Sequence, residues 1–404
     1  MNVKAYRQWI EKEDFYFKRF DLLASRLENF ILNHRLTDSE FTCEVASKFD
    51  SVLRSCDEID YQENSTATAY GILHFLPRFR RFQLTFGKMV DKQVLPLGAR
   101  QINTLDIGTG PGPSIFALSD TYNSLKLFGK LNSINYLQGI DFIPDYVERS
   151  SGFRNWLHHC TELINYELED EHCWKVPYHH GSFHDFDDIE FNPSYNYIDY
   201  DGDFVTRTKK IKHRFNVVVC SNFFTQVSQI ESQSIELQNC MRFMRNKGKL
   251  IISGGSGVAS KDKNYPEIYK KAKEILLANV YGNYKFYAKA NYVKITRNKL
   301  AFDLQDRFGK RIKSFNKVIL ERFKEHNALD YMPENVRDLF IASSSEEYNY
   351  EYKWEFHIFE KFARIKRKKK TWSKQLSFRA VRRAKHERCV EGNRCPPLPM
   401  GFTM

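Results

Sequence analysis

Residues 104–114 read TLDIGTGPGPS, and more of the architecture follows from this segment than from any other. An apolar strand ends just after Asp106, a glycine-rich turn follows, and a helix begins near Ser114. Glycine lets a backbone pass close to a bound molecule because it has no Cβ, and the glycines of this turn are Gly108, Gly110 and Gly112. The two prolines of the turn fix φ near a helix entry, where the first N–H groups need no intrahelical partner.

Two common phosphate-binding loops do not fit this turn. A dinucleotide-binding fingerprint that starts at Gly108 requires glycine at position 113, where the chain has Pro113. A P-loop requires a Gly-Lys-Ser/Thr ending, which is also missing. The remaining pattern is an apolar strand, an acid, and glycine at every second position.

This pattern resembles the first motif of class I S-adenosylmethionine-dependent methyltransferases. The resemblance implies that the cofactor is S-adenosylmethionine, that Gly108, Gly110 and Gly112 hold its methionine part, and that Asp106 lies near its ammonium group. It also implies an acid at the end of the second strand for the ribose hydroxyls, and LQGID supplies Asp141. Near the adenine, the resemblance places Ser182 and Phe183.

The fourth expected strand ends in VCSNFF, residues 219–224, where the family places substrate-facing side chains. We assign catalytic positions to Asn222, whose amide can orient a substrate amine or the cofactor, and to Phe223, which can stack on an aromatic substrate. An Asn that closes a turn and a Phe in the core are the structural alternatives. The segment lacks the two prolines typical of nucleobase amino-methylating enzymes, and Cys220 is interpreted as a small buried hydrophobe.

Short apolar runs alternate with longer segments after residue 101. We expect strands over residues 102–107, 136–140, 175–178, 215–220, 249–253 and 354–362, a helix over 265–278, and a loop over 184–208. Strands separated by crossover-length segments indicate a parallel sheet covered by helices on both faces. The expected fold is therefore α/β and Rossmann-like, with a seven-stranded, mostly parallel sheet.

The chain divides into four expected parts. Residues 1–100 are a helical N-terminal cap, in which Pro77 kinks or splits a helix over 67–90. Residues 101–260 are the cofactor-binding core, and residues 261–362 are an insertion with the last strands of that core. Residues 363–404 are a basic and disordered tail.

The net charge of +12 resides in one segment. Residues Lys361–Arg388 contain 13 Lys or Arg and one acid, Glu387, so the rest of the chain is neutral. A polycation binds phosphates through counterion release, and interleaved aromatic residues stack on unpaired bases. This segment predicts RNA as a partner, with anionic membranes and acidic proteins as alternatives.

Composition excludes several classes of protein. No window of about 18 apolar residues is present, so we expect no transmembrane segment. The eight cysteines are scattered without a CxxC pair, which favours reduced thiols in a cytoplasmic protein. We expect no metal site, because no complete ligand pattern is present. The sequence does not indicate the oligomeric state.

The hypothesis from sequence is a methyltransferase whose acceptor is RNA. The alternatives are a small-molecule or protein methyltransferase, and a non-catalytic scaffold of the same fold that binds RNA or the ribosome. Residues 69–81 and 147–150 also resemble methyltransferase-like proteins associated with the small ribosomal subunit.

Overall fold

A computed structural model describes residues 1–54, 59, 61–166, 183–184, 194–198, 204–208, 215–258, 264–277, 280–281, 284–285 and 293–361. These residues belong to a unit that spans Met1–Phe362. Except for Lys361, the predicted basic tail lies outside the described residues. The division of the first 362 residues into cap, core and insertion stays a prediction.

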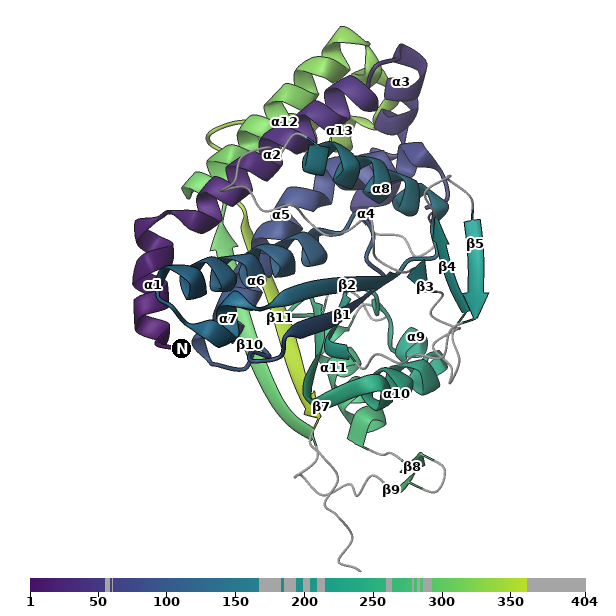
Figure 1. Ribbon diagram of the computed structural model, residues 1–404. Helices are drawn as coiled ribbons and strands as arrows, with labels where there is room; N and C mark the ends of the chain where they lie inside the picture. The colour runs from purple at the N-terminus through teal and green to yellow at the C-terminus, as the bar shows by residue number, and fades with distance from the viewer. Residues whose placement is uncertain are drawn as a thin grey trace, which may run out of the picture. The chain divides into compact units, whose positions relative to one another are not determined.

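A nine-stranded sheet in the order β10-β11-β7-β6-β1-β2-β3-β4-β5 forms the centre of this unit (Figure 1). Its strands are β1 (Gln101–Ile107), β2 (Asp141–Val147), β3 (Phe183–His184), β4 (Ser194–Ile198), β5 (Phe204–Thr208), β6 (Phe215–Ser221), β7 (Met244–Gly254), β10 (Val293–Asp303) and β11 (Glu351–Lys361). Five neighbouring strands, β7, β6, β1, β2 and β3, pair in parallel. β11 runs antiparallel to β7, and β10 runs antiparallel to β11. β8 (Val280–Tyr281) and β9 (Tyr284–Lys285) form a separate pair.

The carboxyl ends of the central strands meet at one edge of the sheet. Ile107, the last residue of β1, pairs with Val147 on one side and with Cys220 on the other. β2 and β3 extend the sheet to one side of β1, whereas β6 and β7 extend it to the other. Such a reversal opens a crevice between the loops that leave the two adjacent strands, and open α/β sheets bind ligands there.

Helices cover both faces of the sheet. They are α1 (Val3–Lys12), α2 (Phe15–His34), α3 (Ser39–Ser47), α4 (Phe49–Arg54), α5 (Asn64–Asp91), α6 (Pro113–Leu131), α7 (Asn135–Gln138), α8 (Ser151–Tyr166), α9 (Val227–Ser232), α10 (Ser234–Phe243), α11 (Tyr265–Leu277), α12 (Arg307–Glu325), α13 (Glu334–Ser343) and the 3₁₀ turn η1 (Ala328–Tyr331). Among the described residues, no helix combines the length and the apolar character that crossing a membrane requires.

Alternate residues of β6 separate two hydrophobic cores. Val217 and Val219 pack in a core with α5, α6 and the N-terminal helices, while Val218 and Cys220 pack in a core with α9, α10 and α11. Both sets are almost fully buried. A strand that is apolar at consecutive positions is buried on both faces, as the sequence indicated for this one.

The sheet is larger than the seven strands expected. β4 and β5 pair with each other and extend the sheet beyond β3. They fall within residues 184–208, where the sequence predicted a loop. The strand predicted over residues 175–178 lies outside the described residues, and the third parallel strand is the short β3.

The second strand was predicted over residues 136–140, directly before its observed position at Asp141–Val147. Residues 136–140 contain most of the short helix α7 and the turn after it, and the strand begins only at Asp141. Leu137 is apolar because it packs against Gly129 of α6. The sequence DFIPDYV of β2 lacks an apolar run, so its pattern did not predict a buried strand.

The N-terminal residues are helical, as predicted, but α5 continues through Pro77 as one helix of 28 residues. This helix packs against α6 and α8 and also contacts α12. α12 lies beside α2 at the top of the view in Figure 1. It buries an apolar stripe and lies within residues 261–362, which the sequence analysis assigned to an insertion.

Candidate functional site

The glycine turn leaves the carboxyl end of β1 and enters α6. Its three glycines adopt left-handed φ angles of 65° at Gly108, 53° at Gly110 and 86° at Gly112. The N–H of Gly108 donates to the carbonyl of Val147 at 2.9 Å, which ties the turn to the end of β2. A Cβ at Gly110 would have only the ring edge of Tyr70, at 4.0 Å, as a neighbour. Gly110 is itself buried, and no other described side chain lies within 4 Å of that position.

Asp106 stabilises this turn from within. Its Oδ2 accepts a hydrogen bond from the Thr109 hydroxyl at 2.5 Å and another from the Ser114 hydroxyl. The residue is 3% exposed. Burial raises the pKa of Asp106 to about 7, although both hydroxyl donors lower it. Its charge therefore changes near neutral pH.

Glu148 is the acid that directly follows β2, and the sequence analysis did not select it for the site. Its Oε2 accepts a hydrogen bond from the N–H of Gly110 at 2.7 Å, and its Oε1 accepts one from the N–H of Ser150 at 2.9 Å. Burial raises the pKa of this carboxyl, although the two N–H donors lower it. The available signal was an acid directly after a strand, but this strand itself was not recognised.

Asp141, which was assigned to the ribose, lies at the other edge of the sheet. It is the first residue of β2 and pairs with Gln101, the first residue of β1. The length of the seven-residue strand, about 20 Å, separates it from the glycine turn. The side chain is exposed. Asp141 therefore cannot contact a ligand on that turn, and the assignment is wrong because the strand was placed too early.

Asn222 and Phe223 follow β6 and lie beside the glycine turn. Asn222 has a left-handed φ of 49°, and its N–H donates to the carbonyl of Ser253 at 2.8 Å. The ring of Phe223 occupies the space that a Cβ at Gly108 would need. The turn after β6 is thus packed on the turn after β1.

The other predicted positions are resolved only in part. Phe183 pairs with Tyr146 near the same edge of the sheet, but its side chain lies outside the described part, as does all of Ser182. Cys220 is buried, and burial raises the pKa of its thiol well above the usual range. This agrees with its interpretation as a small core residue.

Helix α5 contributes a stripe of side chains that the sequence analysis did not select. The stripe consists of Tyr70, His74, Arg78 and Arg81, spaced three or four residues apart on one helix face. A guanidinium N–H of Arg78 donates to the Tyr70 hydroxyl, and the group lies over the Tyr70 ring at 4.8 Å. Burial lowers the pKa of His74 to about 3, and its Nε2 has no hydrogen-bond partner among the described residues.

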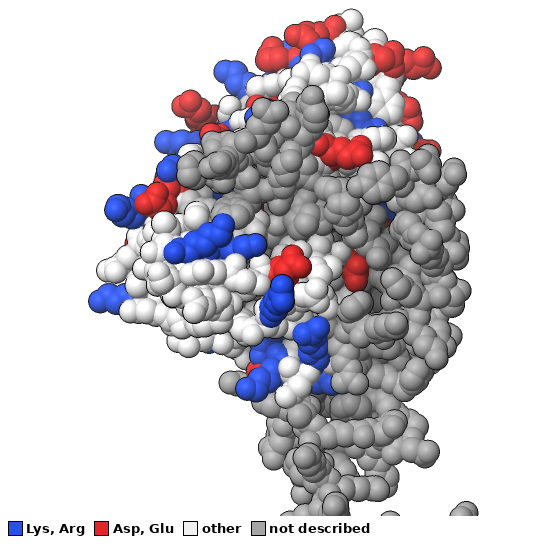
Figure 2. All heavy atoms as spheres, in the orientation of Figure 1, with Lys and Arg blue, Asp and Glu red and all other residues white. Residues whose placement is uncertain are grey.

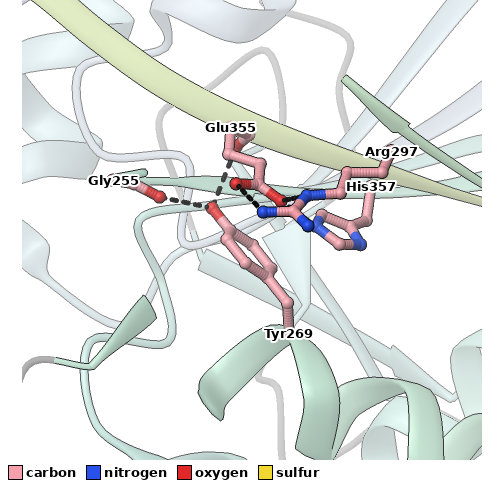
Figure 3. A network of polar contacts seen from close by, with 5 residues as sticks. All are labelled: Gly255, Tyr269, Arg297, Glu355 and His357. Atoms are coloured by element: carbon pink, nitrogen blue, oxygen red, sulfur yellow. Dashed lines mark hydrogen bonds and ion pairs between the residues drawn. The ribbon is translucent and has the colours of Figure 1, made fainter. Parts of the chain in front are cut away.

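A polar network fixes the turn after β7 (Figure 3). The hydroxyl of Tyr269 donates to the carbonyls of Gly255, at 3.0 Å, and Glu355, at 2.9 Å. The Glu355 carboxylate accepts hydrogen bonds from Nε and from one terminal nitrogen of the Arg297 guanidinium, and it is also hydrogen-bonded to Nε2 of His357. Burial raises the pKa of Glu355, but Arg297 and His357 lower it more, so the pKa lies below its ordinary value. The network holds α11 and β11 against the end of β7.

Charged side chains of both signs lie on the described surface. Figure 2 shows Lys and Arg interspersed with Asp and Glu over the helical part of the visible face. In the described part, His, Cys, Asp and Glu side chains form no group of three that could hold a metal ion.

Comparison with protein-family models and with curated protein sequences gave no match. Among solved structures, a phosphoethanolamine N-methyltransferase 2 from Haemonchus contortus, crystallised with S-adenosyl-L-methionine, is 14% identical, covering 76% of this chain and 61% of that enzyme, with a TM-score of 0.35. The [4+2]-cyclase SpnF is 11% identical over 82% of this chain and 97% of its own, with a TM-score of 0.35.

A putative sarcosine dimethylglycine methyltransferase from Galdieria sulphuraria gives a third similarity. It is 10% identical, over 71% of this chain and 86% of its own, with a TM-score of 0.32. Similarities at this level do not carry a functional argument. The function must therefore be argued from the site itself.

Proposed function

We propose that this protein is an S-adenosylmethionine-dependent methyltransferase. One observation carries the proposal. Asp106 lies next to the last residue of β1, and Glu148 directly follows the adjacent parallel strand β2, at the point where the strand order reverses. Both carboxylates accept hydrogen bonds from the same glycine turn. The sheet is mostly parallel around this point, since β3, β2, β1, β6 and β7 run in the same direction. β11 runs against β7.

The residues at this edge fit the cofactor. No described side chain comes closer than 4.0 Å to the position that a Cβ of Gly110 would take, and Thr109 and Glu148 beside it are polar and buried. Each carboxylate oxygen of Glu148 accepts one N–H and keeps a lone pair for a hydroxyl of the ribose diol. Asp106 would stabilise the ammonium group of the methionine part. Glu148 thus takes the role that the sequence assigned to Asp141.

The bound cofactor supplies an activated methyl group, which needs little acid–base catalysis. The protein then contributes chiefly by holding the acceptor in line at close approach. Phe223 borders the glycine turn on the side of β6, and Asn222 lies next to it with an amide that can orient the acceptor. No proton transfer by these two residues is required.

Isothermal titration of the full chain tests the cofactor assignment. We expect S-adenosylmethionine and S-adenosylhomocysteine to bind with micromolar dissociation constants. NAD and ATP serve as controls, because both contain adenosine but lack the methionine part. Absence of S-adenosylmethionine binding at millimolar concentration, or equal binding of all four compounds, would reject the assignment.

The methyl acceptor is a small molecule in our preferred form of the proposal. The half-buried side chains that surround the carboxyl edge, among them Tyr70 and Arg78, favour an acceptor that fits between side chains. RNA is the second candidate, and the 13 basic residues of Lys361–Arg388 favour it. Incubation with methyl-labelled cofactor and separate cellular fractions of small molecules, RNA and protein distinguishes these acceptors.

A non-catalytic scaffold that binds RNA or the ribosome is the remaining alternative from sequence. The buried acids of the glycine turn argue against it, because a fold kept only as a scaffold does not need two buried carboxyl groups there, whose burial costs free energy. Under that alternative, no cellular fraction would accept the labelled methyl group while RNA binding persisted.

A further inference from the structure

Arg78 and Arg81 lack the carboxylate partner that several other arginines of the described structure have. Arg19, Arg297 and Arg311 each form an ion pair with a carboxylate. Neither Arg78 nor Arg81 has a carboxylate partner within the described residues. Guanidinium groups three residues apart on a helix repel each other, and partial burial increases the cost. An anion that contacts both groups would lower this cost.

The surroundings of Arg81 are aromatic. Its guanidinium carbon lies 5.8 Å from the centre of the Trp354 ring, and its Nε is buried without a hydrogen-bond partner in the described structure. Burial lowers the pKa of Arg81 to about 10, and Arg78 lowers it further, whereas Tyr265, Tyr352 and Tyr269 raise it. Aromatic rings orient a guanidinium without neutralising its charge.

The pair lies at the edge of the sheet where the proposed acceptor would bind. Tyr70, the partner of Arg78, borders Gly110 after β1. Tyr265 and Tyr269, which influence the pKa of Arg81, contact the glycines after β7. Helix α5 therefore spans the distance from the cofactor turn to β11, and its two arginines lie along that path.

We propose that Arg78 and Arg81 bind an anionic group, a phosphate or a carboxylate, of the methyl acceptor. The inference rests on the proposed methyltransferase function and specifies its substrate class: a small molecule with a phosphate or carboxylate and a methylatable atom. Guanidinium groups match both anions because they donate paired hydrogen bonds in a plane. One turn away from Arg78, His74 adds a ring nitrogen that has no hydrogen-bond partner among the described residues.

Anion binding to the full chain, loaded with S-adenosylhomocysteine, tests this proposal. The probes are inorganic phosphate and acetate, titrated at constant ionic strength with chloride as the balancing ion. We expect at least one of the two to bind the wild type. Arg78→Gln and Arg81→Gln should each weaken that binding at least about tenfold, the loss of one charged hydrogen-bonding group. The stronger of the two probes identifies the anion as a phosphate or a carboxylate.

Arg80→Gln is the matched control, since it removes the same charge from the same helix. Arg80 lies over the Phe308 ring at 3.4 Å, on the side of α12, and should leave anion binding within twofold of the wild type. If Arg81→Gln does not fold, Arg78→Gln and Arg81→Lys replace it. Arg81→Lys keeps the charge but not the planar donor pair, so we expect intermediate binding.

The outcomes separate this inference from the proposed function. Equal anion binding by the wild type, Arg78→Gln and Arg81→Gln, or no binding to any of them, would overturn the inference while S-adenosylmethionine binding still supported a methyltransferase. Arginine-dependent anion binding without S-adenosylmethionine binding would preserve the anion site and reject the methyltransferase. Binding of a short RNA, but of neither small anion, through these arginines would also overturn it.

Discussion

The two ends of β2 carry one acid each, and their surroundings differ sharply. Asp141 begins the strand and is exposed at the amino edge of the sheet. Glu148 follows the strand, is 8% exposed, and accepts hydrogen bonds from the backbone of the glycine turn. The same kind of side chain is thus a solvated surface group at one edge and part of a candidate site at the other. The direction of the strand determines which of them can have a function.

Replacing Glu148 and Asp141 one at a time should give the largest difference in cofactor affinity. Glu148→Ala removes a charged acceptor of the ribose hydroxyls, so we expect S-adenosylmethionine affinity to fall at least about 100-fold. Asp141→Ala, the matched control, should leave it within twofold. Isothermal titration measures both.

Glu148 also satisfies two backbone N–H groups, so the alanine variant could lose stability as well as affinity. Glu148→Gln keeps an acceptor oxygen and separates these effects. It should melt close to the wild-type temperature and still bind the cofactor more weakly. Equal affinity of the Glu148 and Asp141 variants would contradict the placement of the cofactor at the carboxyl edge.

Glycines at the two ends of β1 offer a second contrast. Gly98 precedes the strand with a φ of 81°, and a Cβ there would meet nothing within 4 Å. Gly108 follows it with a φ of 65°, and a Cβ there would clash with the Phe223 ring. Gly98→Ala should lower the free energy of unfolding by about 1 kcal/mol, the cost of a left-handed alanine. Gly108→Ala adds the clash and should cost about 3 kcal/mol.

Urea denaturation of both glycine variants measures this difference. Cofactor binding provides a second readout, since only the Gly108 variant displaces a ring at the site. We expect Gly98→Ala to bind S-adenosylmethionine like the wild type. Equal losses of stability would show that the Phe223 ring moves away without cost.

The pH dependence of the carboxyl edge should follow from Asp106. Burial raises its pKa to about 7, and a bound ammonium group favours the charged form. S-adenosylmethionine affinity should therefore rise about tenfold between pH 6 and pH 8, as this carboxyl loses its proton. Asp106→Asn should bind more weakly and without that rise, which titration at several pH values would show.

The free energy of unfolding of the unliganded protein should fall, not rise, as the pH increases. An acid with a raised folded-state pKa stabilises the fold fully below its unfolded value, and this contribution is lost as the pH rises through about 7. The wild type should therefore lose stability relative to Asp106→Asn between pH 5 and pH 8. A constant difference across that range would contradict the assigned pKa.

Sequence patterns predicted the strands whose own residues are apolar. β1, β6, β7 and β11 were expected within a few residues of their observed bounds, because burial on one or both faces leaves a run of apolar residues. β2 was missed, since it contains Pro144 and two aspartates and still lies between β1 and β3. Its position depends on its neighbours in the sheet, which local sequence does not reveal.

The sequence indicated candidate site residues in two short segments, 104–114 and 219–224. The glycine turn, Asp106 and its neighbours are consecutive in the chain, and the structure brings Phe223 to the same place. The pairing of Glu148 with Gly110 spans 38 residues, and the approach of Arg81 to Trp354 joins a helix to the last strand. Such pairings follow from strand order and helix packing.

The network at the end of β7 should show the smallest effect. Tyr269→Phe removes the hydroxyl that joins the carbonyls of Gly255 and Glu355, while the ring stays stacked on His357 at 4.3 Å. We expect a loss of about 1 kcal/mol in the free energy of unfolding, the usual value for a hydrogen bond of this kind. Cofactor affinity should not change, because this network lies beyond β6, away from the β1–β2 side where Glu148 binds the glycine turn. Thermal melting and titration of the same variant test both expectations, and a large loss of affinity would show that the two sides of the carboxyl edge are coupled.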